Sequence, residues 1–175
     1  TFLSGQWEEG FPPLLNQPYT KVQDLRYGEN PHQSAALYRE SRPLPSDIVS
    51  AEQLQGKELS FNNYIDLNAA WELVRELGSG AVGIIKHTNP CGVAVGEDQL
   101  KTFILAREVD PVSAFGGIIG FNEPVTAPVA EEILKNFVEA VVAPGFDEEA
   151  VKLFSAKKNI RLMKMPNADF SSKDH

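Results

Sequence analysis

From residue 64 to residue 165, amphipathic helical spacing alternates with short apolar runs, and short loops join them. Apolar residues that recur every three or four positions indicate helices, whereas short runs rich in Val and Ile indicate buried strands. Helices are predicted at 64–77, 98–109, 126–137 and 147–156, and strands at 81–85, 118–121, 138–143 and 160–165. This alternation is typical of a mostly parallel sheet covered on both faces, so we expect a three-layer α/β/α fold.

Polar residues at the ends of the predicted helices support this assignment. Asn62 or Asn63 can cap the start of the first helix, and Asp98 can cap the second, because their side chains accept hydrogen bonds from free backbone N–H groups. Gly78 stands just beyond the end of the first helix, where a glycine often terminates helical structure.

The chain divides into three predicted parts. Residues 1–19 contain scattered Gly and Pro and are interpreted as an extended segment, either a linker or an arm packed on its own domain. Residues 20–166 form the main domain, which begins with two short strands at 21–27 and 34–39. Residues 167–175 are a polar tail.

Composition excludes several classes of protein. The 175 residues are 42% hydrophobic and 23% charged, as expected for one globular domain. The net charge of −8 argues against a nucleic-acid platform, although local cations can still hold an anionic small ligand. A single cysteine excludes an internal disulfide and fits a reducing compartment, and no apolar run approaches a membrane helix, so we expect a cytoplasmic location without membrane contact. The chain lacks an initiator Met, which indicates a piece of a longer protein.

Lys86 and His87 end the apolar run 81–85 and precede an Asn-Pro turn. They would therefore stand at the carboxyl end of a strand, where ligands bind in open α/β sheets. The pair is either a polar strand end or a catalytic pair, in which a neutral imidazole takes a proton and an ammonium stabilises an oxyanion. The downstream residues faintly match a zinc deaminase signature, but a single cysteine leaves too few ligands, so no metal is predicted.

Other polar segments allow two interpretations each. The turn at 26–33 is either solvated or binds an anion through its Arg. Asn62-Asn63 is either a helix cap or an anion and amide site. The segment 113–117 either turns the chain or lets its backbone approach a ligand. Glu139 interrupts an apolar strand, so its carboxylate is either exposed at an edge or paired.

Four segments, in this order, resemble the formyltransferase region of the AICAR transformylase/IMP cyclohydrolase family. They are LRYGENPHQ at 25–33, QGKELSFNN at 55–63, KHTNPCG at 86–92 and DPVSAFGG at 110–117. The resemblance covers about residues 20 to 165, and it rests on the four motifs together rather than on any one of them.

The resemblance implies transfer of a formyl group from the co-substrate 10-formyltetrahydrofolate to the exocyclic amine of AICAR in purine biosynthesis. That amine is a weak nucleophile, so its proton must be removed and the tetrahedral oxyanion stabilised. By resemblance, His87 transfers the proton and Lys86 stabilises the charge. The resemblance also implies substrate contacts, namely the nucleotide phosphate for Arg26 and Tyr27, the base or ribose for Asn63, the folate for Phe115 and Gly116, and a ribose hydroxyl or another polar group of the nucleotide for Glu139.

The family's fold is similar to that of cytidine deaminases, in two successive copies without zinc. Nothing in this chain matches the second copy or the hydrolase domain, the IMP cyclohydrolase, so we expect the first half of the transferase, with little turnover alone. The family's sites form between subunits, which implies a homodimer. Two alternatives remain open at this point, a non-catalytic nucleotide-binding module and an assembly domain.

Overall fold

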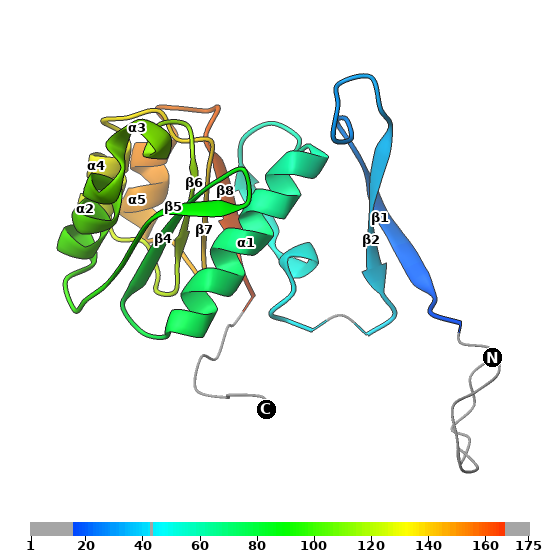
Figure 1. The fold of residues 1–175 in the computed structure, drawn as a ribbon, viewed down its shortest axis with the longest axis horizontal. Helices are drawn as coiled ribbons and strands as arrows, with labels where there is room; N and C mark the ends of the chain where they lie inside the picture. Colours follow the sequence, from blue (N-terminus) through cyan, green and yellow to red (C-terminus); the bar gives the residue numbers. More distant parts are fainter. Residues whose placement is uncertain (1–15, 43, 167–175) are drawn as a thin grey trace, which may run out of the picture.

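The computed structural model describes residues 16–42 and 44–166, which form a six-stranded sheet with helices and a projecting two-stranded hairpin (Figure 1). Most of the predicted segment 1–19 and the whole predicted tail 167–175 lie outside the described residues. The strands are β1 Tyr19–Leu25, β2 Ala35–Glu40, β3 Glu52–Gln55, β4 Ala81–Lys86, β5 Asn89–Val95, β6 Ile118–Phe121, β7 Ala140–Ala143 and β8 Arg161–Lys164. The helices are the 3-10 turn Ile48–Ser50, α1 Phe61–Leu77, α2 Gln99–Val109, α3 Pro111–Ala114, α4 Ala127–Ile133 and α5 Glu148–Phe154.

The main sheet has six strands in the order β3-β8-β7-β6-β4-β5. Strands β6, β7 and β8 run parallel, whereas β3 is antiparallel to β8 and β4 is antiparallel to both β6 and β5. The sheet is therefore mixed, and the prediction of a mostly parallel sheet was wrong. The error arises at 89–95, where Asn-Pro and Gly were expected to form a loop but instead form the edge strand β5 of a tight hairpin, a position that tolerates proline.

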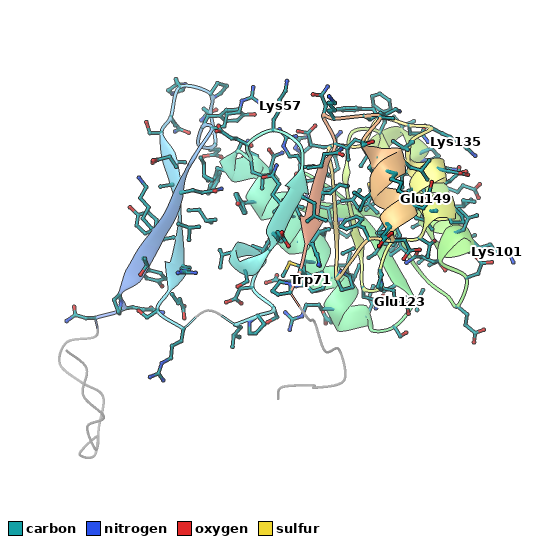
Figure 2. All side chains as sticks on the ribbon, turned by 180° about the vertical axis from the view of Figure 1, so that it is seen from behind. Lys57, Trp71, Lys101, Glu123, Lys135 and Glu149 are labelled. Atoms are coloured by element: carbon teal, nitrogen blue, oxygen red, sulfur yellow. The ribbon has the colours of Figure 1, made fainter. Side chains whose placement is uncertain are left out.

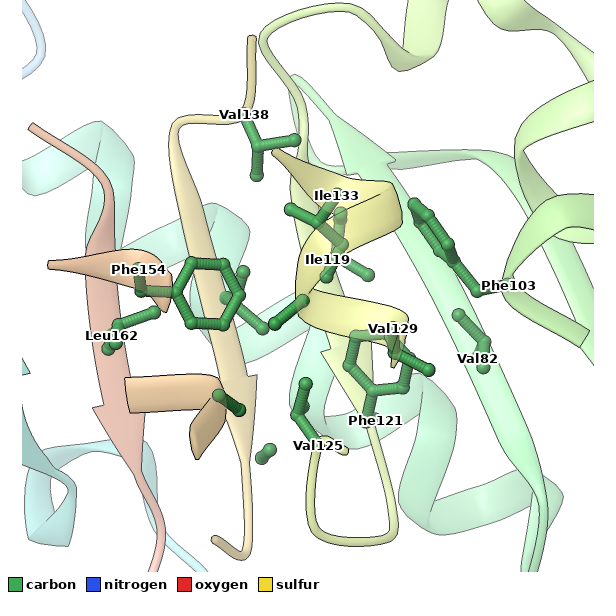
Figure 3. Packing of buried hydrophobic residues seen from close by; sticks show 14 of the residues in the cluster. Val82, Phe103, Ile119, Phe121, Val125, Val129, Ile133, Val138, Phe154 and Leu162 are labelled. Atoms are coloured by element: carbon green, nitrogen blue, oxygen red, sulfur yellow. The ribbon is translucent and has the colours of Figure 1, made fainter. Parts of the chain in front are cut away.

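Helices cover both faces of the sheet, as the alternating pattern predicted. Helix α1 packs its buried residues Leu67, Trp71 and Val74 against one face, and the indole N–H of Trp71 donates to the carbonyl oxygen of Ser46 at 2.8 Å. The opposite face is covered by α2, α4 and α5, whose aromatic residues Phe103 and Phe154 pack over alternate strand residues (Figure 3). Strand residues thus point in turn to two separate cores.

The ends of the helices follow local capping chemistry, with one correction. Ser60, and not Asn62 or Asn63, caps α1, because its hydroxyl accepts from the backbone N–H of Asn63 while the Asn63 side chain accepts from the backbone N–H of Ser60. Asp98 caps α2 as predicted, and Gly78 ends α1 with a φ of 81°. The helix consequently begins three residues earlier than its apolar spacing indicated.

Candidate active site

One end of the sheet gathers the predicted functional residues. Since β4 is antiparallel to β6, with Ile85 opposite Ile118, the carboxyl end of β4 lies beside the amino ends of β6, β7 and β8. The segments 115–117 and 137–139 enter β6 and β7 at this end. In Figure 2, Lys57 and Lys135 mark the same end of the molecule and Glu123 marks the opposite end. The predicted site residues were expected at the carboxyl end of a strand. They do lie at the carboxyl end of β4, but this is the amino end of the three parallel strands β6, β7 and β8.

Lys86 and His87 lie where β4 turns into β5. Lys86 pairs with Asn89 across the hairpin, so His87 and Thr88 form a two-residue turn, with φ values of 51° and 63°. The Lys86 ammonium donates to the carbonyl oxygen of Phe115 at 2.7 Å. This bond fixes a positive charge beside the segment that leads into β6.

The backbone of this turn is held from several sides. Thr88 N–H donates to Oδ1 of Asp66 on α1 at 2.7 Å. The carbonyl oxygen of His87 accepts from Nδ2 of Asn89 at 2.8 Å and from the Thr88 hydroxyl at 2.7 Å. The His87 side chain is exposed, and its imidazole forms no hydrogen bond or ion pair within the described part of the chain. The ring is therefore available to exchange a proton with a ligand.

Phe115 and Gly116 lie directly beside the Lys86 ammonium. The rings of Phe115 and Phe137 are 5.5 Å apart between centroids and are 59% and 48% exposed, so they present an apolar surface to solvent. Gly116 has a φ of 70° and donates its N–H to the carbonyl oxygen of Phe137 at 2.8 Å. A Cβ at this position would lie 3.0 Å from the Phe137 ring and 3.3 Å from Lys86 Nζ, so both conformation and space favour glycine.

Glu139 is paired, which was one of its two predicted interpretations. Its Oε1 accepts from Nη1 of Arg161 at 2.7 Å and from Nδ2 of Asn63 at 3.4 Å. Arg161 is only 5% exposed, and it also donates to the carbonyl oxygens of Lys57 at 3.2 Å and Glu58 at 3.4 Å. Two predicted site residues, Asn63 and Glu139, are thus in contact, and Glu139 is also paired with Arg161, which sequence reasoning missed. The available signal was a charged residue near the start of the run 160–165, where Arg161 and Lys164 stand among apolar residues.

Arg26 and Tyr27 are docked on the start of α1. The N–H of Arg26 donates to the carbonyl oxygen of Leu59 at 3.2 Å, and Tyr27 accepts from the N–H of Phe61 at 3.1 Å. The exposed Arg26 guanidinium lies 5.3 Å from the centre of the Tyr27 ring, and in the described residues it has no carboxylate partner. No hydrogen bond or ion pair of the described residues joins Arg26 to Lys86 directly.

A cavity of about 430 Å³ lies behind Phe115, between α2, α3 and α4. Its walls include the apolar side chains of Phe103, Ile119 and Ile133. At the same cavity Glu132 accepts from Lys135 and from Arg107, and these two cations hold the pKa of the Glu132 carboxyl below its ordinary value. The Glu132 carboxylate at this cavity is therefore already paired with cations of the same chain.

Neither a metal site nor a membrane span is present in the part of the chain that the structure describes. No group of three or more His, Cys, Asp or Glu side chains there is arranged to hold a metal ion. None of the helices in 16–42 and 44–166 has both the length and the apolar character needed to cross a bilayer.

Comparison with known proteins gives a family match and many similar curated proteins. A family model described as "AICARFT/IMPCHase bienzyme" matches residues 1–175. The "Bifunctional purine biosynthesis protein PurH" of Magnetococcus marinus is 53% identical over 172 residues, covering 95% of this chain and 32% of that protein. The chain thus spans about a third of the length of this curated relative.

Proposed function

The chain belongs to the AICARFT/IMPCHase bienzyme family, and from that membership we propose that it is part of the AICAR formyltransferase of purine biosynthesis. The observation that carries the proposal is the meeting of Lys86, Phe115 and Gly116 at one end of the sheet, next to His87, whose imidazole has no partner among the described residues. The reaction moves the formyl group of 10-formyltetrahydrofolate to the exocyclic amine of AICAR.

Each group near the turn has a part in this chemistry. His87 takes a proton from the exocyclic amine as its nitrogen attacks the formyl carbon and the carbonyl becomes an oxyanion. The Lys86 ammonium, held by the Phe115 carbonyl at 2.7 Å, stabilises that negative charge. The bond from the formyl carbon to folate N10 then breaks, and the imidazolium returns the proton to N10. No metal takes part in this scheme.

Substrate contacts extend along the same end of the molecule. Arg26, whose guanidinium has no carboxylate partner within residues 16–42 and 44–166, binds the nucleotide phosphate beside Tyr27. Asn63 and Glu139, already joined through their side chains, bind the base or ribose and a ribose hydroxyl or another polar group of the nucleotide. The exposed rings near Phe115 offer the folate an apolar surface, and Gly116 lets it approach the backbone.

The larger assembly is also a proposal. We propose that residues 20–166 form a cytidine deaminase-like unit, preceded by a linker or arm at 1–19 and followed by a polar tail at 167–175. The complete site requires a second unit, and it forms in a cytoplasmic homodimer without nucleic acid or membrane. The mixed sheet with helices on both faces is compatible with such a unit, and the match to only 32% of the PurH relative supports the need for further segments.

Calorimetric titration with AICAR tests the binding part of this proposal. Arg26→Ala should weaken binding roughly tenfold or more, since a hydrogen bond to a charged group contributes about 1.5–3 kcal/mol. Arg42→Ala is the matched control and should bind like wild type, because Arg42 is an exposed arginine that forms no hydrogen bond or ion pair among the described residues. Equal affinity of wild type and Arg26→Ala would contradict the phosphate assignment.

The catalytic part is tested by adding the remaining segments of the PurH relative to this chain and measuring formyl transfer. His87→Ala should lower the rate by about 10²–10⁴, the usual contribution of a positioned general base. Unchanged turnover in His87→Ala would refute the proton-transfer role. Binding of AICAR without turnover in the complemented wild type would favour a non-catalytic nucleotide-binding module instead.

A further inference from the structure

The turn that presents His87 has an unfavourable backbone conformation. His87 and Thr88 both have positive φ, at 51° and 63°. Two-residue hairpin turns of this kind normally contain Asn-Gly or Asp-Gly. Glycine has no side chain to clash in the left-handed region, and Asn and Asp tolerate that region better than other residues do. Thr88 is branched at Cβ, which makes the conformation still less favourable. Contacts outside the hairpin must therefore stabilise it.

Asp66 supplies such a contact from α1. The N–H of Thr88 takes no part in the β4–β5 ladder, whose last pair is Lys86 with Asn89, and it donates to Asp66 Oδ1 at 2.7 Å. A hydrogen bond to a carboxylate is among the stronger ones in proteins. Asp66 is itself firmly placed, because its neighbour Leu67 is fully buried under the sheet.

We propose that Asp66 is a positioning residue that holds the His87-Thr88 turn in its left-handed conformation and so fixes where the imidazole is presented. The contact is to the backbone, and the imidazole has no partner among the described residues, so Asp66 acts on the placement of His87 and not on its proton. This inference rests on the proposed function for its consequence in catalysis, but its structural content is independent of it.

The structural content is tested by NMR on the 175-residue chain. At φ near +60° the amide and Cα protons of one residue lie close together, so His87 and Thr88 should show strong intraresidue cross-peaks. Asp66→Ala should reduce both cross-peaks at least twofold, because the turn then populates negative φ. Asp66→Asn should retain them, since its Oδ1 still accepts the Thr88 N–H. Undiminished cross-peaks in Asp66→Ala would overturn the proposal.

A second substitution separates placement from chemistry. Glycine adopts positive φ without a penalty, so Asp66→Ala with Thr88→Gly should recover the His87 cross-peak without any carboxylate. In the complemented enzyme, Asp66→Ala should lower kcat about tenfold with KM for AICAR little changed. The added Thr88→Gly should restore most of the lost kcat. Glu72→Ala, an exposed carboxylate on the same helix, is the control and should leave both unchanged.

The outcomes distinguish this proposal from the function on which it rests. In one outcome, Asp66→Ala loses rate and the added Thr88→Gly restores the His87 cross-peak but not the rate. That outcome would assign Asp66 a direct chemical role and overturn the positioning role. If the wild-type complemented enzyme transfers no formyl group but the cross-peaks respond as expected, the proposed function fails and Asp66 still positions the turn.

Discussion

Gly92 allows helix α2 to lie against strand β5, and its replacement by alanine should strongly destabilise the fold. The residue belongs to the motif 86–92 and was expected to help form a turn, but it lies within β5 opposite Ile84. A Cβ at this position would meet the carbonyl oxygen of Ala106 at 1.9 Å and its carbonyl carbon at 2.9 Å. The obstacle is helix backbone, so no rotation of a side chain can relieve it.

The magnitude follows from this geometry. Real Cβ contacts essentially never fall below 3.0 Å, so α2 would have to move away by roughly 1 Å, the difference from 1.9 Å. That movement would loosen the packing of Phe103 and Ala106, which are both buried in the core. Overpacking typically lowers the free energy of unfolding by about 1–3 kcal/mol. Because the obstacle here is backbone, Gly92→Ala should lower it by about 3 kcal/mol or more. For a domain of this size the melting temperature should fall by roughly 6–12 °C.

Urea unfolding followed by circular dichroism measures this loss. The control is Gly145→Ala, because a Cβ there would meet only Pro124 at the ordinary distances of 3.6 and 3.7 Å, and it should change stability by less than about 0.5 kcal/mol. The slope of free energy against urea should be similar in all three proteins, so that a shifted midpoint reports stability. A Gly92→Ala midpoint equal to that of wild type would refute the steric argument.

Three further predictions concern the charged and titratable groups. Glu139→Gln should destabilise by about 1–2 kcal/mol, because the buried Arg161 guanidinium loses its charged acceptor, and an unchanged urea midpoint would contradict this. Burial raises the pKa of the Cys91 thiol, so iodoacetamide should alkylate it more slowly at pH 8 than it alkylates an unfolded control in urea, and equal rates would refute the shift. A hydrogen bond from the backbone N–H of Lys101 lowers the pKa of the Asp98 carboxyl, and a hydrogen bond from the Ser113 hydroxyl lowers the pKa of the Asp110 carboxyl. The stabilisation from these two carboxylates is therefore complete above the unfolded pKa of about 3.9 and is lost as the pH falls through their lower folded pKa values. Replacing both residues by Asn should reduce the loss of stability in acid. An identical profile of stability against pH in the double variant would exclude the two carboxylates as the source of that loss.

Local chemistry explains the parts of the fold that the sequence predicts well. Strand 118–121 was predicted with its observed bounds, and the predicted helix 98–109 ends at the observed residue, because Asp98 caps α2 and Asp110-Pro111 ends it. Strand β5 was missed for the opposite reason. Its Asn-Pro and Gly are typical of loops, whereas its hairpin turn lacks the Asn-Gly or Asp-Gly that would have announced it.

The candidate site divides in the same way between local and distant information. Motifs named Lys86 and Glu139 directly, since each is a polar residue at or within an apolar run. Their partners depend on register and docking. Arg161 lies beside Glu139 only because β7 and β8 run parallel with Ala140 opposite Arg161. Asp66 reaches the turn only because α1 packs against the sheet. Neither of these two contacts can be predicted from the residues that neighbour Glu139 or Thr88 in the sequence.

The reversed direction of β4 is what assembles the site. With Val82 opposite Phe121 and Ile85 opposite Ile118, the end of β4 meets the beginning of β6 and lies beside the segments 115–117 and 137–139. A β4 parallel to β6, as predicted, would have put Lys86 beside Phe121, at the opposite end of the sheet from Glu139. The hairpin that sequence reasoning missed is therefore the feature that brings the Lys-His pair to its neighbours. The antiparallel strand β5, which follows the pair, covers the edge of β4. The absence of a Cβ at its Gly92 lets α2 pack closely against it.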